Sequence, residues 1–185
     1  SINRERYWDI KMERVAARAY GPTPRATATY TPSGPRPDTV SLTSRVQVKP
    51  YAQPRNDRMR VPLPKAFLCG PLAEGHALPA PMGVFAPYST RRHDLILPMA
   101  FSVRRRITIA WPAGWRLVNA LDPVALREDF GSCEVTYRSS ANTLAIDFQL
   151  NLDTPRIPRE AYARFRRLCT LADRVAETVL VLEKE

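Results

Sequence analysis

"TLAIDFQLNL", residues 143–152, alternates apolar and polar residues from one end to the other. The apolar positions are Leu144, Ile146, Phe148, Leu150 and Leu152. Successive side chains of a β-strand point to opposite faces of the sheet, so this alternation predicts a strand with one packed face and one polar face. A strand of this kind needs partners, and the flanking sequence offers them.

Neighbouring segments show the same period of two. "SVRRRITIAW" (102–111), "WRLVNAL" (115–121) and "SCEVTYR" (132–138) read as strands, and "PAGW" and "SSAN" read as the turns beside them. The apolar positions of the first and third runs are Val103, Ile107, Ile109 and Trp111, and Cys133, Val135 and Tyr137. Alternating runs joined by short turns predict an antiparallel β-sandwich or a curled sheet. An earlier run, "TVSLTSRVQV" (39–48), predicts a further half-buried strand.

The chain ends in a segment of a different period, "RIPREAYARFRRLCTLADRVAETVLVLEK" (156–184). Its apolar stripe recurs in steps of four and three, at Ala161, Phe165, Leu168, Ala172 and Val175, with Tyr162 and Cys169 beside it. This spacing predicts an amphipathic helix, and Pro158 suits its first turn. Residues 178–182 then read as a closing strand. Burial of the stripe against the sheet is worth several kcal/mol at ~25 cal/mol per Å2, so packing alone accounts for this helix.

Proline divides the chain: thirteen of its eighteen prolines lie at or before Pro87. Residues 50–98 therefore read as loops and short edge strands. At the N-terminus, Trp8, Met12, Val15 and Ala19 favour a helix, although alternation of Trp8, Ile10 and Met12 leaves a strand open. We expect a mainly β protein: an antiparallel β-sandwich with a C-terminal helix and closing strand, plus an N-terminal helix. Residues 1–98 and 99–185 form two regions or one continuous domain.

The bulk composition is that of a globular chain, with 185 residues, 44% hydrophobic and 25% charged. Since no run approaches the ~18 consecutive apolar residues of a membrane helix, we expect no membrane span. The chain begins with Ser1 and shows no signal peptide, which suggests a processed protein or an excised piece. Cys69, Cys133 and Cys169 are odd in number and far apart, and we interpret them as single buried thiols.

Cys69 and His76, in "FLCGPLAEGH", are the most tempting catalytic pair, because a thiol beside an imidazole can act as a nucleophile. Gly70 and Pro71 follow directly and break regular structure, whereas an activated thiol normally lies at a helix N-terminus or beside a cation. We therefore interpret Cys69 as a loop cysteine and assign no catalytic residue. A cryptic hydrolase that depends on Cys69 is a third, minor hypothesis.

The second histidine, His93, precedes Asp94, but adjacent residues of an extended chain point apart. Neither histidine lies in an HxxxH or HExxH spacing, and no phosphate-binding glycine motif occurs. We expect no metal and no cofactor.

Arginine dominates the net charge of +10, since only four of the 28 basic residues are lysines. Genomic codon preference explains such a bias more readily than anion recognition does. Alternation along 102–111 places Arg104 and Arg106 on one face and Arg105 on the other. The candidates for an anion-binding surface are Arg91, Arg92, Arg104 and Arg106. The alternative function is thus a basic module that binds an anionic polymer, such as a cell-wall component or nucleic acid, although nucleic acid is not favoured because no aromatic-interleaved motif accompanies the arginines.

The C-terminal ninety residues also resemble a family. The segments "RRHDLILPMAFSVRRRITIAWPAGWRLVNAL", "FGSCEVTYR" and "IPREAYARFRRLCTLADRVAETVLVLEK" are similar to the β-rich domain of unknown function that follows the transglutaminase-like domain in large bacterial proteins. The matching positions are Arg92, Pro112, Gly114, Trp115, Phe130, Gly131, Tyr137, Pro158, Tyr162, Phe165, Arg166, Asp173 and Leu182. The resemblance covers about half of the chain.

The resemblance implies an accessory role. The family's enzymatic part, a papain-like fold with Cys, His and Asp, would precede this region, and nothing in the chain matches that triad, so no catalytic residue is carried over. The implied function is a non-catalytic scaffold or interaction domain, with the transglutaminase-like domain as partner and the bacterial periplasm or cell envelope as location. The substrate of the parent protein, the oligomeric state and the purpose of the arginine excess stay open.

Overall fold

A computed structural model describes residue 10, residues 25–32, 40–47, 52 and 54–63, and residues 81–185. The expected N-terminal helix lies outside these residues apart from Ile10, which is helical. Cys69 and His76 also lie outside them.

The larger sheet is four-stranded and antiparallel, in the order β6–β10–β9–β8. Its strands are β6 (Phe101–Ala110), β8 (Val124–Glu128), β9 (Gly131–Ser140) and β10 (Thr143–Leu152). In register, Ile146 of β10 lies opposite Ile107 on one side and Tyr137 on the other. All five apolar residues predicted to face inward on β10 are buried, which confirms the period-two prediction.

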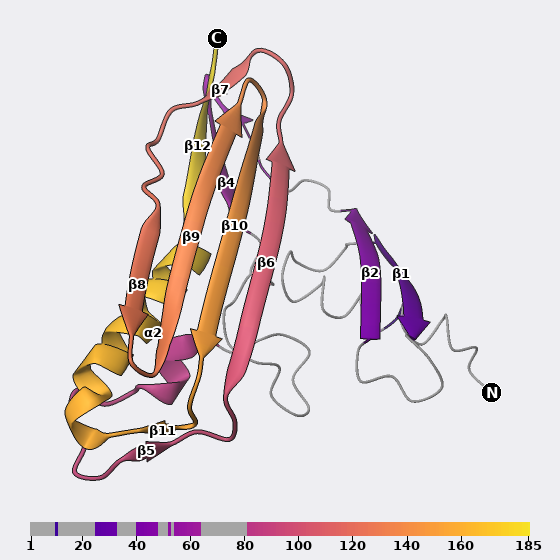
Figure 1. The fold of residues 1–185 in the computed structure, drawn as a ribbon. Coiled ribbons are helices and arrows are strands. Elements are labelled where there is room, and N and C mark those ends of the chain that lie inside the picture. The colour runs from indigo at the N-terminus through magenta and orange to yellow at the C-terminus, as the bar shows by residue number, and fades with distance from the viewer. Residues whose placement is uncertain (1–9, 11–24, 33–39, 48–51, 53, 64–80) are drawn as a thin grey trace.

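The smaller sheet has the order β3–β4–β12–β7. Its strands are β3 (Pro54–Arg55), β4 (Arg58–Pro62), β7 (Trp115–Leu117) and β12 (Val179–Lys184). Leu180 and Leu182 of β12 are fully buried in the same core as the inward residues of β10. The predicted closing strand is confirmed. In Figure 1 this sheet lies behind one half of the larger sheet, which makes the sandwich.

Helix α2 (Tyr162–Ala176) covers the other half of the larger sheet (Figure 1). A 3-10 turn, η3 (Arg159–Ala161), precedes it, so Pro158 lies one residue before the helical region rather than in the first turn of α2. Every residue of the predicted stripe is buried. Phe165 of α2 meets Phe130 edge to face, with ring centroids 5.9 Å apart. The whole apolar face of α2 is therefore packed in the core and shielded from solvent.

The turn after β6 carries the chain from one sheet to the other, because β7 pairs with β12 and not with β6. Gly114 takes a φ of +80°, a conformation that costs glycine nothing. Trp111 is buried, and its indole Nε1–H donates to the carbonyl of Trp115 at 2.8 Å. The side chain of Asn119 bonds the backbone of β12 beyond the end of β7. Its amide NH2 donates to the carbonyl of Val179, and its side-chain oxygen accepts from the N–H of Val181.

Three smaller elements complete the described fold. Strands β1 (Arg25–Pro32) and β2 (Val40–Gln47) form a hairpin, which confirms the strand predicted near residues 39–48. Strand β5 (Leu95–Ile96) pairs with β11 (Arg156–Ile157), and η2 (Met82–Phe85) packs beside α2. All strand pairs described are antiparallel. The mainly β fold class, with its C-terminal helix and closing strand, is confirmed.

Candidate functional site

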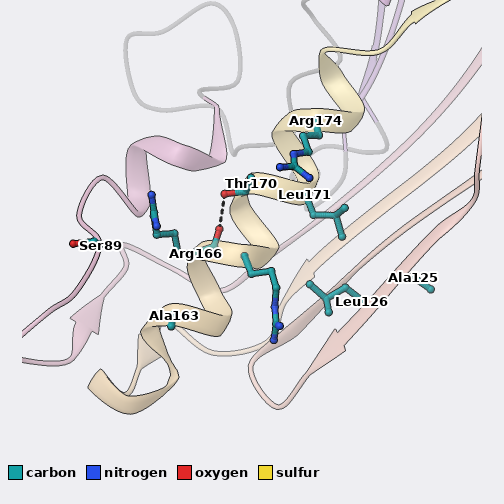
Figure 2. Close-up of a pocket in the computed structure, with 9 residues that line it drawn as sticks. Ser89, Ala125, Leu126, Ala163, Arg166, Thr170, Leu171 and Arg174 are labelled. Atoms are coloured by element: carbon teal, nitrogen blue, oxygen red, sulfur yellow. Dashed lines mark hydrogen bonds between the residues drawn. The ribbon is translucent and has the colours of Figure 1, made fainter.

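An open groove of about 440 Å3 runs along the solvent side of α2. Its lining comes from three parts of the chain: the segment after η2, strand β8 and the helix itself. The lining residues are Ser89, Ala125, Leu126, Ala163, Arg166, Arg167, Thr170, Leu171 and Arg174. Figure 2 shows Leu171 of the helix on the side of Leu126, with Arg166 and Ser89 on the other side.

Helical spacing explains why these side chains meet. Arg166, Thr170 and Arg174 follow one another at steps of four, which aligns them along one ridge of α2. The hydroxyl of Thr170 donates to the carbonyl of Arg166 at 3.0 Å, so it is bonded within the helix. The ridge adjoins the apolar stripe that docks α2 on the sheet, and its residues are exposed because that stripe faces the core.

The guanidinium groups of the groove differ in their partners. Arg167 contacts Glu128 at 3.2 Å, and Arg164 contacts the same carboxylate at 2.8 Å. The side chain of Glu128 is only 8% exposed, so this pair of arginines compensates a carboxylate that is largely removed from water. Within the part of the chain that the structure describes, Arg166 and Arg174 form no ion pair. Among the described residues that line the groove there is no carboxylate.

The four arginines predicted as an anion-binding surface are not gathered together. Arg104 and Arg106 lie exposed on the outer face of β6, the face of the larger sheet opposite α2. Arg106 is already paired with Asp147 at 2.7 Å, and this hydrogen bond holds the pKa of the Asp147 carboxyl below its usual value. Arg91, by contrast, lies over the ring of Tyr162, with 5.6 Å between its Cζ and the ring centroid.

Arg92 is exposed beside Arg91, near β5. The placement therefore gives no support to a continuous anion-binding surface made by these four residues. The predicted split of the arginines across β6 is observed: Arg105 is half-buried on the core side, between two exposed neighbours.

His93 and Asp94 do not form a catalytic pair in the structure. The Asp94 carboxylate instead accepts from Arg156, at 2.8 Å from its Nε, and from the backbone N–H of Arg159. These bonds lower the pKa of Asp94, with the Arg156 bond as the main cause. Asp94 thus fastens the chain that enters η3 to the β5 segment, while His93 stays exposed.

Two of the three cysteines are described, and both are buried free thiols. Desolvation raises the pKa of Cys133 to about 12 and raises that of Cys169 as well. A thiol with a raised pKa is a poor nucleophile at neutral pH because the thiolate is the reactive form. In the described ranges there is no group of three His, Cys, Asp or Glu residues that could hold a metal ion, and no helix long and apolar enough to cross a membrane.

Sequence reasoning did not identify the groove. Arg166, Arg167 and Arg174 lie on the polar side of the helix, but the walls of the groove come from residues about 40 and 80 positions earlier in the chain. A detectable feature was present: two arginines eight residues apart with a threonine midway, on the border of an apolar stripe.

The architecture defines a class, a two-sheet β domain closed by one helix and one strand. Within that class the chain belongs to the family of domains of unknown function described as DUF3858, whose family model matches residues 79–182. This confirms the resemblance to a domain of unknown function. None of the curated proteins compared matches the chain.

A comparison with solved structures finds similarity to a protein from Parabacteroides distasonis, provisionally described as a protease. It is 20% identical, the similar region covers 55% of this chain and 20% of that protein, and the TM-score is 0.48. The chain thus aligns with about a fifth of that protein's length.

Proposed function

We propose that this chain is a non-catalytic accessory domain, a scaffold or interaction module beside a transglutaminase-like catalytic domain of a larger bacterial protein in the periplasm or cell envelope. One observation supports the proposal most directly: the residues through which the chain resembles the family serve packing and backbone support. Phe130 and Phe165 pack together, and Asp173 accepts backbone hydrogen bonds from Met82 and Gly83.

Tyr162 extends this pattern. Its hydroxyl donates to the carbonyl of Tyr88 at 3.1 Å, and its ring makes a cation–π contact with the guanidinium of Arg91. Gly131 lies so close to the backbone of Asn151 that no side chain fits there. A family pattern built from such positions specifies a fold. Arg166 is different, because it is exposed and lines the groove.

The parent polypeptide tests this proposal. We expect the parent polypeptide to contain, N-terminal to this chain, a domain with Cys, His and Asp in papain-like order. Thiol-dependent acyl transfer or hydrolysis by the parent should then disappear when that upstream cysteine is replaced by alanine and persist in a Cys69→Ala variant. A parent without such a domain, or hydrolysis by the isolated chain that is lost in Cys69→Ala, would contradict the proposal.

A further inference from the structure

We propose that the groove along α2 is a docking site for an acidic polypeptide segment of a partner, one that carries an aliphatic side chain between its carboxylates. This inference rests on the proposed interaction role, and it names the surface and the chemistry of the partner. It involves Arg166 and Arg174 as carboxylate-binding residues and Leu126 and Leu171 as the apolar part of the floor.

The charge of the groove is available to a ligand. Three exposed arginines outside the groove are neutralised within the fold: Arg106 by Asp147, Arg156 by Asp94 and Arg116 by Glu183. In the groove, only Arg167 has a carboxylate partner among the described residues, and its partner Glu128 is shared with Arg164. Arg166 and Arg174 therefore present positive charge, and their planar guanidinium groups match the geometry of a carboxylate.

The spacing sets the size of the occupant. Arg166 and Arg174 are eight residues apart on one helix, which is about 12 Å along its axis. An extended polypeptide covers that distance with about four residues, at ~3.3 Å for each residue. A short segment with two carboxylates three or four positions apart can therefore reach both arginines at once.

The floor favours a polypeptide over a nucleic acid. Leu126 and Leu171 lie on the β8 side of α2, beside the ridge formed by Arg166, Thr170 and Arg174, and Leu171 falls between the two arginines along the helix. Single-stranded nucleic acids gain much of their affinity by stacking bases on aromatic side chains, and none of the described residues that line the groove is aromatic. An aliphatic side chain flanked by carboxylates matches both features of the surface.

The test is a fluorescence-polarisation titration with a fluorescein-labelled acidic peptide of sequence Glu-Leu-Glu-Glu-Leu-Glu. We expect the unmodified chain to bind it at low ionic strength, with an affinity that declines as salt screens the charges. The double variant Arg166→Gln/Arg174→Gln should weaken binding by about tenfold or more. Glutamine is a good helix former, so α2 should persist, and circular dichroism and the thermal midpoint verify this.

Two controls distinguish specific binding in the groove from general attraction between a basic protein and an acidic peptide. Arg60→Gln removes one positive charge from β4, on the smaller sheet, and should change the affinity by less than about twofold. A peptide with serine in place of leucine should bind more weakly, because it loses the apolar floor. Equal binding of the double variant, equal binding of the serine peptide, or no binding by the unmodified chain would each overturn the inference.

A single-stranded oligonucleotide of the same charge provides the last comparison. If it binds more tightly than the peptide and loses affinity in the double variant, the groove is a nucleic-acid site and the polypeptide assignment is wrong. Failure of the peptide to bind leaves the proposed accessory function intact, since that function is tested by the parent polypeptide and its upstream cysteine.

Discussion

The carboxylate of Asp173 on α2 accepts a hydrogen bond of 2.7 Å from the backbone N–H of Gly83, 90 residues earlier in the chain. Its other oxygen accepts from Met82, also at 2.7 Å, and Met82 is completely buried. One side chain thus satisfies two N–H groups at the start of η2, a turn that has no side-chain cap of its own. This contact fastens the end of the proline-rich region to the helix that packs against the larger sheet.

Replacement of Asp173 by alanine should therefore lower the free energy of unfolding by about 2–3 kcal/mol, because two partly buried donors lose a charged acceptor. Asp173→Asn, which keeps one acceptor oxygen, should cost about half as much. Urea denaturation measures both values. The matched control is Asp122→Ala at an exposed position, for which the change should stay within about 0.5 kcal/mol. Equal losses for Asp173→Ala and Asp122→Ala would refute this capping role.

Arg106 should control the titration of Asp147. Its guanidinium lies 2.7 Å from one carboxylate oxygen, while Arg138 lies 3.6 Å from the other. The pKa of Asp147 is lowered, mainly by the Arg106 hydrogen bond, so the pair stabilises the fold above the ordinary value of 3.8 and loses this effect as the pH falls through the lowered pKa. In carboxyl-carbon NMR titrations, Arg106→Gln should raise the Asp147 pKa clearly, and Arg138→Gln should raise it less. The reverse order would contradict this assignment.

Arg105 should protect an edge of the larger sheet. It lies half-buried on the core side of β6, the outermost strand on that side of the sheet order, and a charge at such a position discourages pairing with another chain. We expect Arg105→Val to change stability by no more than about 1 kcal/mol, since valine suits a strand. Light scattering should nevertheless show stronger, concentration-dependent association. Arg105→Lys is the charge-preserving control, and association of both variants to the same extent would exclude this role.

The sequence predicted those parts of the fold in which a single period decides burial. In β10 and α2 the apolar positions are regular, and each predicted inward residue is buried. Strand β8 was not predicted, because its inward positions include Glu128, which is acceptable there only through Arg164 and Arg167 of the distant helix. The groove was not predicted for the same reason. Its walls join residues that are far apart in the chain, and such contacts leave no local pattern in the sequence.

The buried thiols should give the fold a characteristic alkaline pH dependence. The pKa of Cys133 is raised by desolvation from 9.0 to about 12, so the folded state keeps a proton that the unfolded state releases. Stability is therefore fully present below pH 9 and is lost as the pH rises toward 12, by up to about 1.4 kcal/mol per pH unit for each thiol. Urea denaturation between pH 8 and about pH 10.5 measures the slope. Cys133→Ala should flatten it relative to the unmodified chain, whereas parallel curves would show that Cys133 contributes nothing.

Gly131 and Gly114 should respond differently to the same substitution. A Cβ on Gly131 would collide with the backbone carbonyl of Asn151 in the neighbouring strand, and it would also lie 3.2 Å from the Cα of Leu152. Because backbone cannot rotate away as a side chain can, we expect Gly131→Ala to cost about 3 kcal/mol, the upper end for overpacking. Gly114 has open space around its Cβ position but a φ of +80°, so Gly114→Ala should cost about 1–2 kcal/mol through backbone conformation alone. Asparagine tolerates that conformation, and Gly114→Asn should recover part of the loss, whereas Gly131→Asn should be at least as destabilising as Gly131→Ala. Denaturation midpoints for the four variants decide the matter, and a recovery at Gly131 would mean that β9 and β10 are not in the close register described.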